Sequence, residues 1–174
     1  MLDSMGQGSE TRAEDAAVPA SVRRDLPLVY ACSGCSSAAQ LANHLAVRLD
    51  RADEAEMSCI AGVGGGVKPL VQMARRAQDR GRPILAIDGC ALRCVGHSLA
   101  RIGVEPTRHL LLSDAGVRKL AHSDFDPQQA RQLLLQCTAL VRELARQAAA
   151  PARGAERGQP RIDMPATTAH RDAA

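Results

Sequence analysis

Two pairs of closely spaced cysteines are the residues of this chain best suited to chemistry. Cys32 and Cys35 form one pair, and Cys90 and Cys94 form the other. Thiolates bind soft and borderline metal ions and attack electrophiles. A thiol at the start of a helix loses its proton more easily, because a helix N-terminus favours negative charge. The pairs therefore predict a metal site or a reactive thiol site.

Each pair lies where an apolar run ends and a helical pattern begins. A run over 26–31 precedes the first pair, and a run over 83–87 precedes the second. Apolar residues at helical spacing follow each pair, over 38–49 and 92–102. On this interpretation the second pair spans one helical turn, so both of its sulfurs fall on the same side of that turn.

The rest of the chain continues the alternation of strands and helices. Strands are expected over 56–60 and 108–112, and helices from about Pro69 to Gly81 and from Asp126 to Ala148. This rhythm predicts an α/β protein with a parallel sheet covered on both faces. We expect a small Rossmann-like three-layer fold, with a four-stranded parallel sheet in the order 2-1-3-4 and a C-terminal helix.

Several single residues have a predicted structural role. Ser36 or Ser37 is expected to cap the first helix, and Asp126 followed by proline is a strong start signal for the last one. Capping is also the favoured role for Asp88, ahead of binding a cysteine N–H or acting as a base. The glycine-rich stretch 62–66 is expected to be a tight turn rather than a phosphate loop.

The remaining cysteine and histidines are expected to be structural or solvent-facing. Cys137 falls on the apolar stripe of the last helix and is expected to fill the core. His44 and His97 are expected on the surface, and no partner can be identified for His109 or His122.

The expected topology brings the two cysteine pairs to one place. Strands 1 and 3 are neighbours in that order, and open α/β sheets bind ligands at the carboxyl ends of their strands. Cys59 follows strand 2 at the same edge, and Asp88 and Asp114 end there too. Four thiolates suit zinc, which takes four sulfurs in a tetrahedron. Helix N-termini, backbone N–H groups and Arg93 could offset the net charge of such a site.

The same residues carry a resemblance to a known family. The segments that carry it are Tyr30-Ala31-Cys32-Ser33-Gly34-Cys35-Ser36, Met57-Ser58-Cys59, Ile87-Asp88-Gly89-Cys90-Ala91-Leu92-Arg93-Cys94 and Leu112-Ser113-Asp114-Ala115-Gly116-Val117. Together they resemble the DGC-domain family, named for the motif that stands here as Asp88-Gly89-Cys90. The resemblance covers about 26–120 and implies a zinc site with four chelating cysteines, without implying a reaction.

Five cysteines are then available for four places. We assign Cys32, Cys35, Cys90 and Cys94 as zinc ligands, and keep Cys59 and Asp88 in reserve as substitute ligands or neighbours of the site. Two alternatives stay open: a redox, sulfur-transfer or metalloid-transfer enzyme that uses Cys32 and Cys35, and an iron–sulfur cluster on the same ligands. Whether the protein is an enzyme is left open.

Composition sets the class of protein and of partner. The chain has 174 residues, 45% of them hydrophobic and 1% aromatic, so one domain with an aliphatic core is expected. A net charge of +3 spread along the chain, with almost no aromatic rings, argues against nucleic-acid binding. No apolar run approaches the roughly 20 residues that span a membrane.

The ends of the chain have no periodic pattern. Disordered segments are expected over 1–24 and 149–174, on either side of a domain at 25–148. No secretory signal is recognisable, so a cytoplasmic protein with reduced thiols is expected. A metal ion is the one partner that the sequence indicates, and protein partners cannot be inferred.

Overall fold

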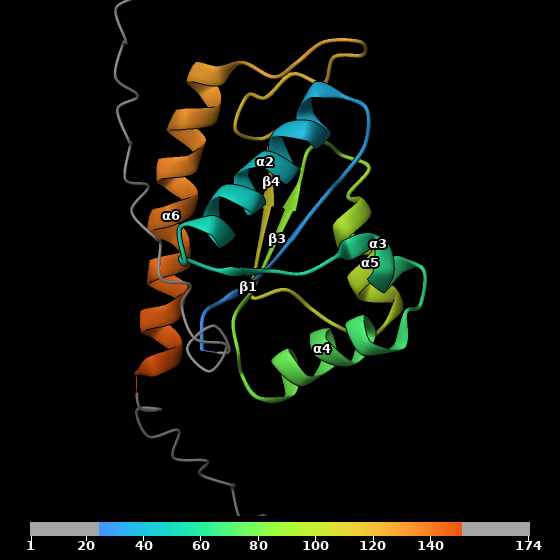
Figure 1. Ribbon diagram of the computed structural model, residues 1–174, viewed down its shortest axis with the longest axis vertical. Helices are drawn as coiled ribbons and strands as arrows, with labels where there is room; N and C mark the ends of the chain where they lie inside the picture. The colour runs from blue at the N-terminus through green and yellow to red at the C-terminus, as the bar shows by residue number, and fades with distance from the viewer. Residues whose placement is uncertain (1–24, 151–174) are drawn as a thin grey trace, which may run out of the picture.

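The computed structural model describes residues 25–150 as alternating strands and helices (Figure 1). The strands are β1 (Leu28–Ala31), β2 (Glu56–Met57), β3 (Ile84–Asp88) and β4 (Arg108–Leu111). The helices are α2 (Ser37–Arg51), α3 (Ile60–Gly64), α4 (Lys68–Asp79), α5 (Cys94–Arg101) and α6 (Pro127–Ala149). The two segments predicted to be disordered, 1–24 and 149–174, lie outside the described residues, apart from residues 149 and 150.

The four strands form one parallel sheet in the order β2-β1-β3-β4, which confirms the predicted topology. The two central strands pair in register from Leu28 with Ile84 to Ala31 with Ile87. Every residue of both strands is buried. This is why each strand appears in the sequence as a continuous apolar run rather than an alternating one.

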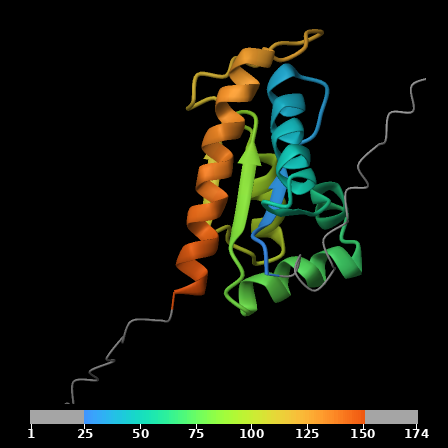
Figure 2. The ribbon, with the colours of Figure 1, turned by 60° about the vertical axis from the view of Figure 1, so that its left-hand side comes forward.

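Helices cover both faces of the sheet. Helices α2 and α6 pack against each other on one face, while α3, α4 and α5 lie together on the other (Figures 1 and 2). The long helix α6 runs beside α2 and buries a stripe of side chains: Ala130, Leu133, Cys137, Val141 and Leu144. Cys137 therefore fills the core, as predicted.

The predicted helix caps at both ends of the domain are confirmed. The Ser36 side chain accepts a hydrogen bond from the backbone N–H of Ala39 at the start of α2. Asp126 caps α6 by accepting from the N–H of Gln128 at 2.7 Å, and Pro127 takes the first helical position. Ser37 has a different role, since its hydroxyl bonds to the chain beyond β4.

The prediction for 56–66 is wrong in part. Strand β2 ends at Met57, and the glycine-rich stretch that was expected to turn instead contributes to the short helix α3. The last two glycines, Gly65 and Gly66, do form a turn between α3 and α4. Gly62 lies against Leu70, since a Cβ built there would come within 2.1 Å of Leu70 Cδ1. The short helix therefore forms despite the low helix propensity of glycine.

The expected helix from Leu92 begins two residues later than predicted. Arg93 is left-handed, with φ 47° and ψ 46°, and α5 starts at Cys94. The backbone N–H of Arg93 donates to the carbonyl of Cys90 and closes a turn between them. Leu92 is 63% exposed instead of lying on a buried helix face. The two cysteines of the second pair thus do not share a helical turn.

Within residues 25–150, no helix is both long enough and apolar enough to cross a membrane.

Candidate functional site

The cysteine-bearing segments meet at the carboxyl edge of the sheet. Cys32 directly follows β1, and Cys90 follows the end of β3 by two residues. Cys59 lies between β2 and α3, directly before the first residue of α3. Because β1 and β3 are hydrogen-bonded neighbours, their carboxyl ends lie side by side. The N–H of Cys32 donates to the carbonyl of Ile87 at 2.9 Å, which extends this pairing past the end of β1.

Cys32 is the buried thiol of the group. The side chain of Cys94 and the backbone N–H of Gly89 both lie close enough to Cys32 to influence the pKa of its thiol. Burial raises the pKa of the Cys32 thiol, the Gly89 N–H opposes this, and Cys94 and Asp88 add to it. The expectation that a thiol in this setting ionises more easily is therefore wrong for Cys32, since burial outweighs the nearby N–H.

The other thiols at this edge are more accessible. Cys35, Cys59 and Cys94 are exposed, and Cys90 is partly buried. Across residues 25–150, no group of three or more histidine, cysteine, aspartate or glutamate side chains is arranged to hold a metal ion. The structure thus places Cys94 near Cys32, while the assignment of four ligands stays a prediction. Asp114 is exposed in the turn after β4.

Gly89 fixes the distance between the second cysteine loop and α2. A Cβ at this position would lie 2.6 Å from the carbonyl carbon and oxygen of Ala38 and 2.9 Å from the amide nitrogen of Ala39. All three atoms are backbone, so no side-chain movement could make room. Only glycine lets the chain after β3 run directly against the first turn of α2 and bring its N–H to Cys32.

Asp88 caps α5 from the end of β3, as predicted. Its carboxylate is fully buried and accepts from the backbone N–H groups of Val95 at 2.9 Å and Gly96 at 3.1 Å. One of its oxygens also lies 2.8 Å from Nε2 of His109 on β4. These contacts anchor the start of α5, and with it Cys94, to the central strand.

His109 is the residue at this edge that the sequence interpretation missed. Its ring lies between Asp88 and Arg93, whose guanidinium is 3.0 Å from Nδ1. Arg93 therefore reaches toward His109, although it was expected to offset the charge of a thiolate site. The sequence did contain a signal for this contact. In the expected strand order, the strand that carries His109 pairs with the strand that ends at Asp88.

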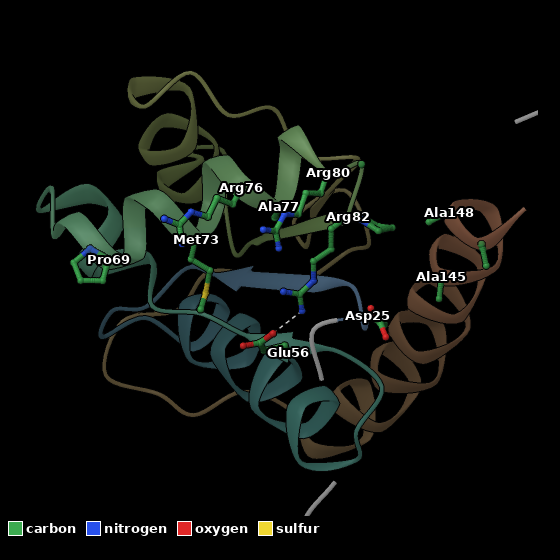
Figure 3. Close-up of a pocket in the computed structure, with 13 residues that line it drawn as sticks. Asp25, Glu56, Pro69, Met73, Arg76, Ala77, Arg80, Arg82, Ala145 and Ala148 are labelled. Atoms are coloured by element: carbon green, nitrogen blue, oxygen red, sulfur yellow. Dashed lines mark hydrogen bonds and ion pairs between the residues drawn. The ribbon is translucent and has the colours of Figure 1, made fainter. Parts of the chain in front are cut away.

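Two of the cavities formed by residues 25–150 bear on the site, and no cysteine lines either of them. The larger, about 1080 Å³, lies at the amino edge of the sheet between α4 and the end of α6 (Figure 3). Its wall includes the ion pair of Arg82 and Glu56 at 2.6 Å. The smaller, about 470 Å³, lies beside α5 and is lined by Arg93 and His109, among others. The smaller cavity thus adjoins the segment that carries Cys90 and Cys94.

Comparison with known proteins agrees with the resemblance of the cysteine segments. The DGC domain matches residues 28–137, which includes both cysteine pairs. The chain is 59% identical over 116 residues to "Anaerobic and virulence modulator AnvM" of Pseudomonas aeruginosa, covering 67% of this chain and 86% of that relative. No solved structure matches. The chain therefore belongs to the DGC-domain family.

Proposed function

We propose that this protein binds a zinc ion through cysteine thiolates at the carboxyl edge of its sheet, and that it has a structural, carrier or sensor role. The observation that carries the proposal is the proximity of Cys32 and Cys94, which come from two different strand–helix junctions at the same edge of the sheet. Cys35 and Cys90 belong to the same two junctions and complete the proposed set of ligands.

The donors fit zinc in kind. Zinc binds thiolate sulfur readily, and a site with four protein ligands is typical of structural zinc. Since the described arrangement brings two sulfurs together, Cys35 and Cys90 would have to turn toward the Cys32–Cys94 pair when the metal binds. Cys35 is exposed and Cys90 only partly buried, so neither side chain is held in place by the core.

The surroundings of the pair support an anionic site. Helix α2 starts beside Cys35, and the Gly89 N–H lies close enough to Cys32 to lower the pKa of its thiol. Helix N-termini and convergent N–H groups stabilise negative charge, which a zinc ion with four thiolates would carry. A bound metal would also displace the thiol protons, so affinity should rise with pH.

The family relationship favours regulation over catalysis. The relative from Pseudomonas aeruginosa is named as a modulator, and a protein of that kind needs a state that changes with conditions. A thiolate-bound metal supplies such a state, because oxidation or loss of the metal alters the cysteine loops. We therefore favour a sensor role within the proposed set.

Metal analysis of anaerobically purified full-length protein tests the proposal. We expect about one zinc per chain in the wild type, and loss of that zinc in Cys90→Ser, since one of the ligands is removed. Cys137→Ala is the matched control, because it removes a thiol in the core and should keep the metal. Full zinc content in Cys90→Ser would refute the ligand assignment. A brown preparation containing iron would favour the iron–sulfur alternative.

A second candidate is a redox thiol site, and the proximity of Cys94 to Cys32 favours it. A disulfide reagent such as oxidised glutathione would accept two electrons from the two thiols, forming one protein disulfide and two molecules of reduced glutathione. We expect the disulfide to join Cys32 to Cys94, and not Cys32 to Cys35. Peptide mapping after oxidation of metal-free protein distinguishes the two pairings.

A further inference from the structure

We infer that the cavity beside α5 binds a small molecule carrying a carboxylate, and that Arg93 is the residue that pairs with the carboxylate. The cavity measures about 470 Å³, within the range of roughly 300–1,000 Å³ typical of small-molecule sites. Its lining includes Arg93, Gly96, Ala100, Glu105 and His109. This binding does not depend on the proposed zinc site.

The orientation of His109 follows from its two neighbours. A guanidinium group can only donate hydrogen bonds, so Nδ1 of His109 must accept the one from Arg93 at 3.0 Å. Nε2 then carries the ring hydrogen and donates it to the Asp88 carboxylate at 2.8 Å. The ring is thus held in place by a carboxylate that is itself fixed by two backbone N–H groups.

Arg93 is left with a charge that no carboxylate balances. Within residues 25–150, its side-chain partner is the ring of His109, and no aspartate or glutamate lies within ion-pair distance of it. The residue is exposed at the cavity and retains further N–H donors. A guanidinium offers two parallel donors, which match the two oxygens of a carboxylate.

The walls limit the size and charge of the ligand. Gly96 allows the His109 ring to lie directly against α5, since a Cβ there would be 2.9 Å from Cε1 of the ring. Ala100, one helical turn later, keeps that side of the cavity open. Glu105 adds one negative charge to the lining, which disfavours a polyanion such as a nucleotide phosphate. A small carboxylate satisfies these limits.

The test is a titration of ¹⁵N-labelled full-length protein with succinate, acetate and inorganic phosphate, followed by NMR. We expect succinate or acetate to shift the Arg93 side-chain N–H, the Gly96 amide and the His109 ring in a saturable manner. Arg93→Gln should weaken the affinity at least about tenfold, since it removes the charge-assisted pair. Ala100→Leu should do the same by filling the cavity while leaving Arg93 in place.

Arg101→Gln is the matched control, because Arg101 is an exposed arginine of the same helix that does not line the cavity. This variant should bind as the wild type does. The proposal is overturned if no saturable shift occurs, if phosphate alone binds, or if Arg93→Gln binds carboxylates as tightly as Arg101→Gln does. Zinc content measured on the same samples separates this result from the fate of the proposed metal site.

Discussion

The hydroxyl of Ser37 accepts a hydrogen bond from the backbone N–H of Leu120 at 2.9 Å, across 83 residues of sequence. The same hydroxyl donates to the carbonyl of Arg118, and the Ser37 N–H donates to the carbonyl of Leu120 at 3.0 Å. One serine at the start of α2 therefore ties the segment after β4 to the edge of the sheet that carries the cysteines.

Ser37→Ala should lower the free energy of unfolding by about 1–2 kcal/mol, because Leu120 N–H and Arg118 C=O both lose a partly buried partner. Urea unfolding followed by circular dichroism measures the loss. Hydrogen exchange at the Leu120 amide should also speed up. The control is Ser33→Ala, an exposed serine of the first cysteine loop, which should change stability little. Equal stability of the two variants would contradict the role of Ser37.

Gly89→Ala should destabilise the protein by about 2 kcal/mol or more, because the new Cβ would overlap backbone atoms of α2. Thermal unfolding provides the measurement. Gly34→Ala is the matched control in the facing loop, where a Cβ would make an ordinary 3.6 Å contact with Ala39. If Gly89→Ala unfolded at the wild-type temperature, the close approach of the two loops would be wrong.

Iodoacetamide should label the cysteines of metal-free, folded protein in a set order. Cys35 and Cys94 are exposed and should react first, while burial makes Cys32 slower. Cys137 should stay unlabelled until the protein unfolds, because burial raises the pKa of its thiol to about 11 and leaves it 1% exposed. Mass spectrometry of timed samples gives the order. Early labelling of Cys137 would show that α6 does not cover the core as described.

His44 should make the stability of the protein fall at mildly acidic pH. Its ring contacts Phe125, with centroids 5.0 Å apart, and burial together with Arg48 lowers its pKa below the ordinary value. The pKa of His44 is near 6.5 in the unfolded chain and lower in the folded protein. At a pH between these two pKa values, the unfolded chain binds a proton at His44 that the native state does not bind. This contribution to stability is complete above about pH 6.5 and is lost as the pH falls through the folded pKa.

The measurement is the free energy of unfolding in urea at several values between about pH 5 and pH 8. His44→Gln should flatten the acid side of the profile, whereas the exposed control His122→Gln should leave its slope unchanged. A slope that persists in His44→Gln would assign the pH dependence to other groups.

The order and direction of the strands could be predicted from the sequence because their cause is local. The central strands β1 and β3 are buried on both faces, so each appears as an unbroken apolar run that ends at a cysteine loop. Parallel pairing with short loops then leaves few topologies. The convergence of both cysteine pairs on one edge follows from that topology alone.

The details that failed depend on side-chain contacts or on an unusual backbone conformation, neither of which a periodic pattern contains. Ile60–Gly64 is helical although glycines make up two of its five residues, and Gly62 packs against Leu70, a contact that no propensity scale contains. The partner of His109 depends on how β4 lies against β3, which fixes the distance to Asp88. The late start of α5 depends on Arg93 accepting a left-handed backbone, a conformation that few arginines adopt.

The pairing of β1 with β3 also has a consequence for synthesis on the ribosome. Leu28 is translated well before its partner Ile84, and at roughly 5–20 residues per second the delay is about 3–11 s. During that time Leu28–Ala31 is an apolar segment whose main neighbour has not yet been made. The nascent chain therefore passes through a stage in which its future central strand is open to wrong partners, and occupancy by a chaperone at that stage would protect the fold.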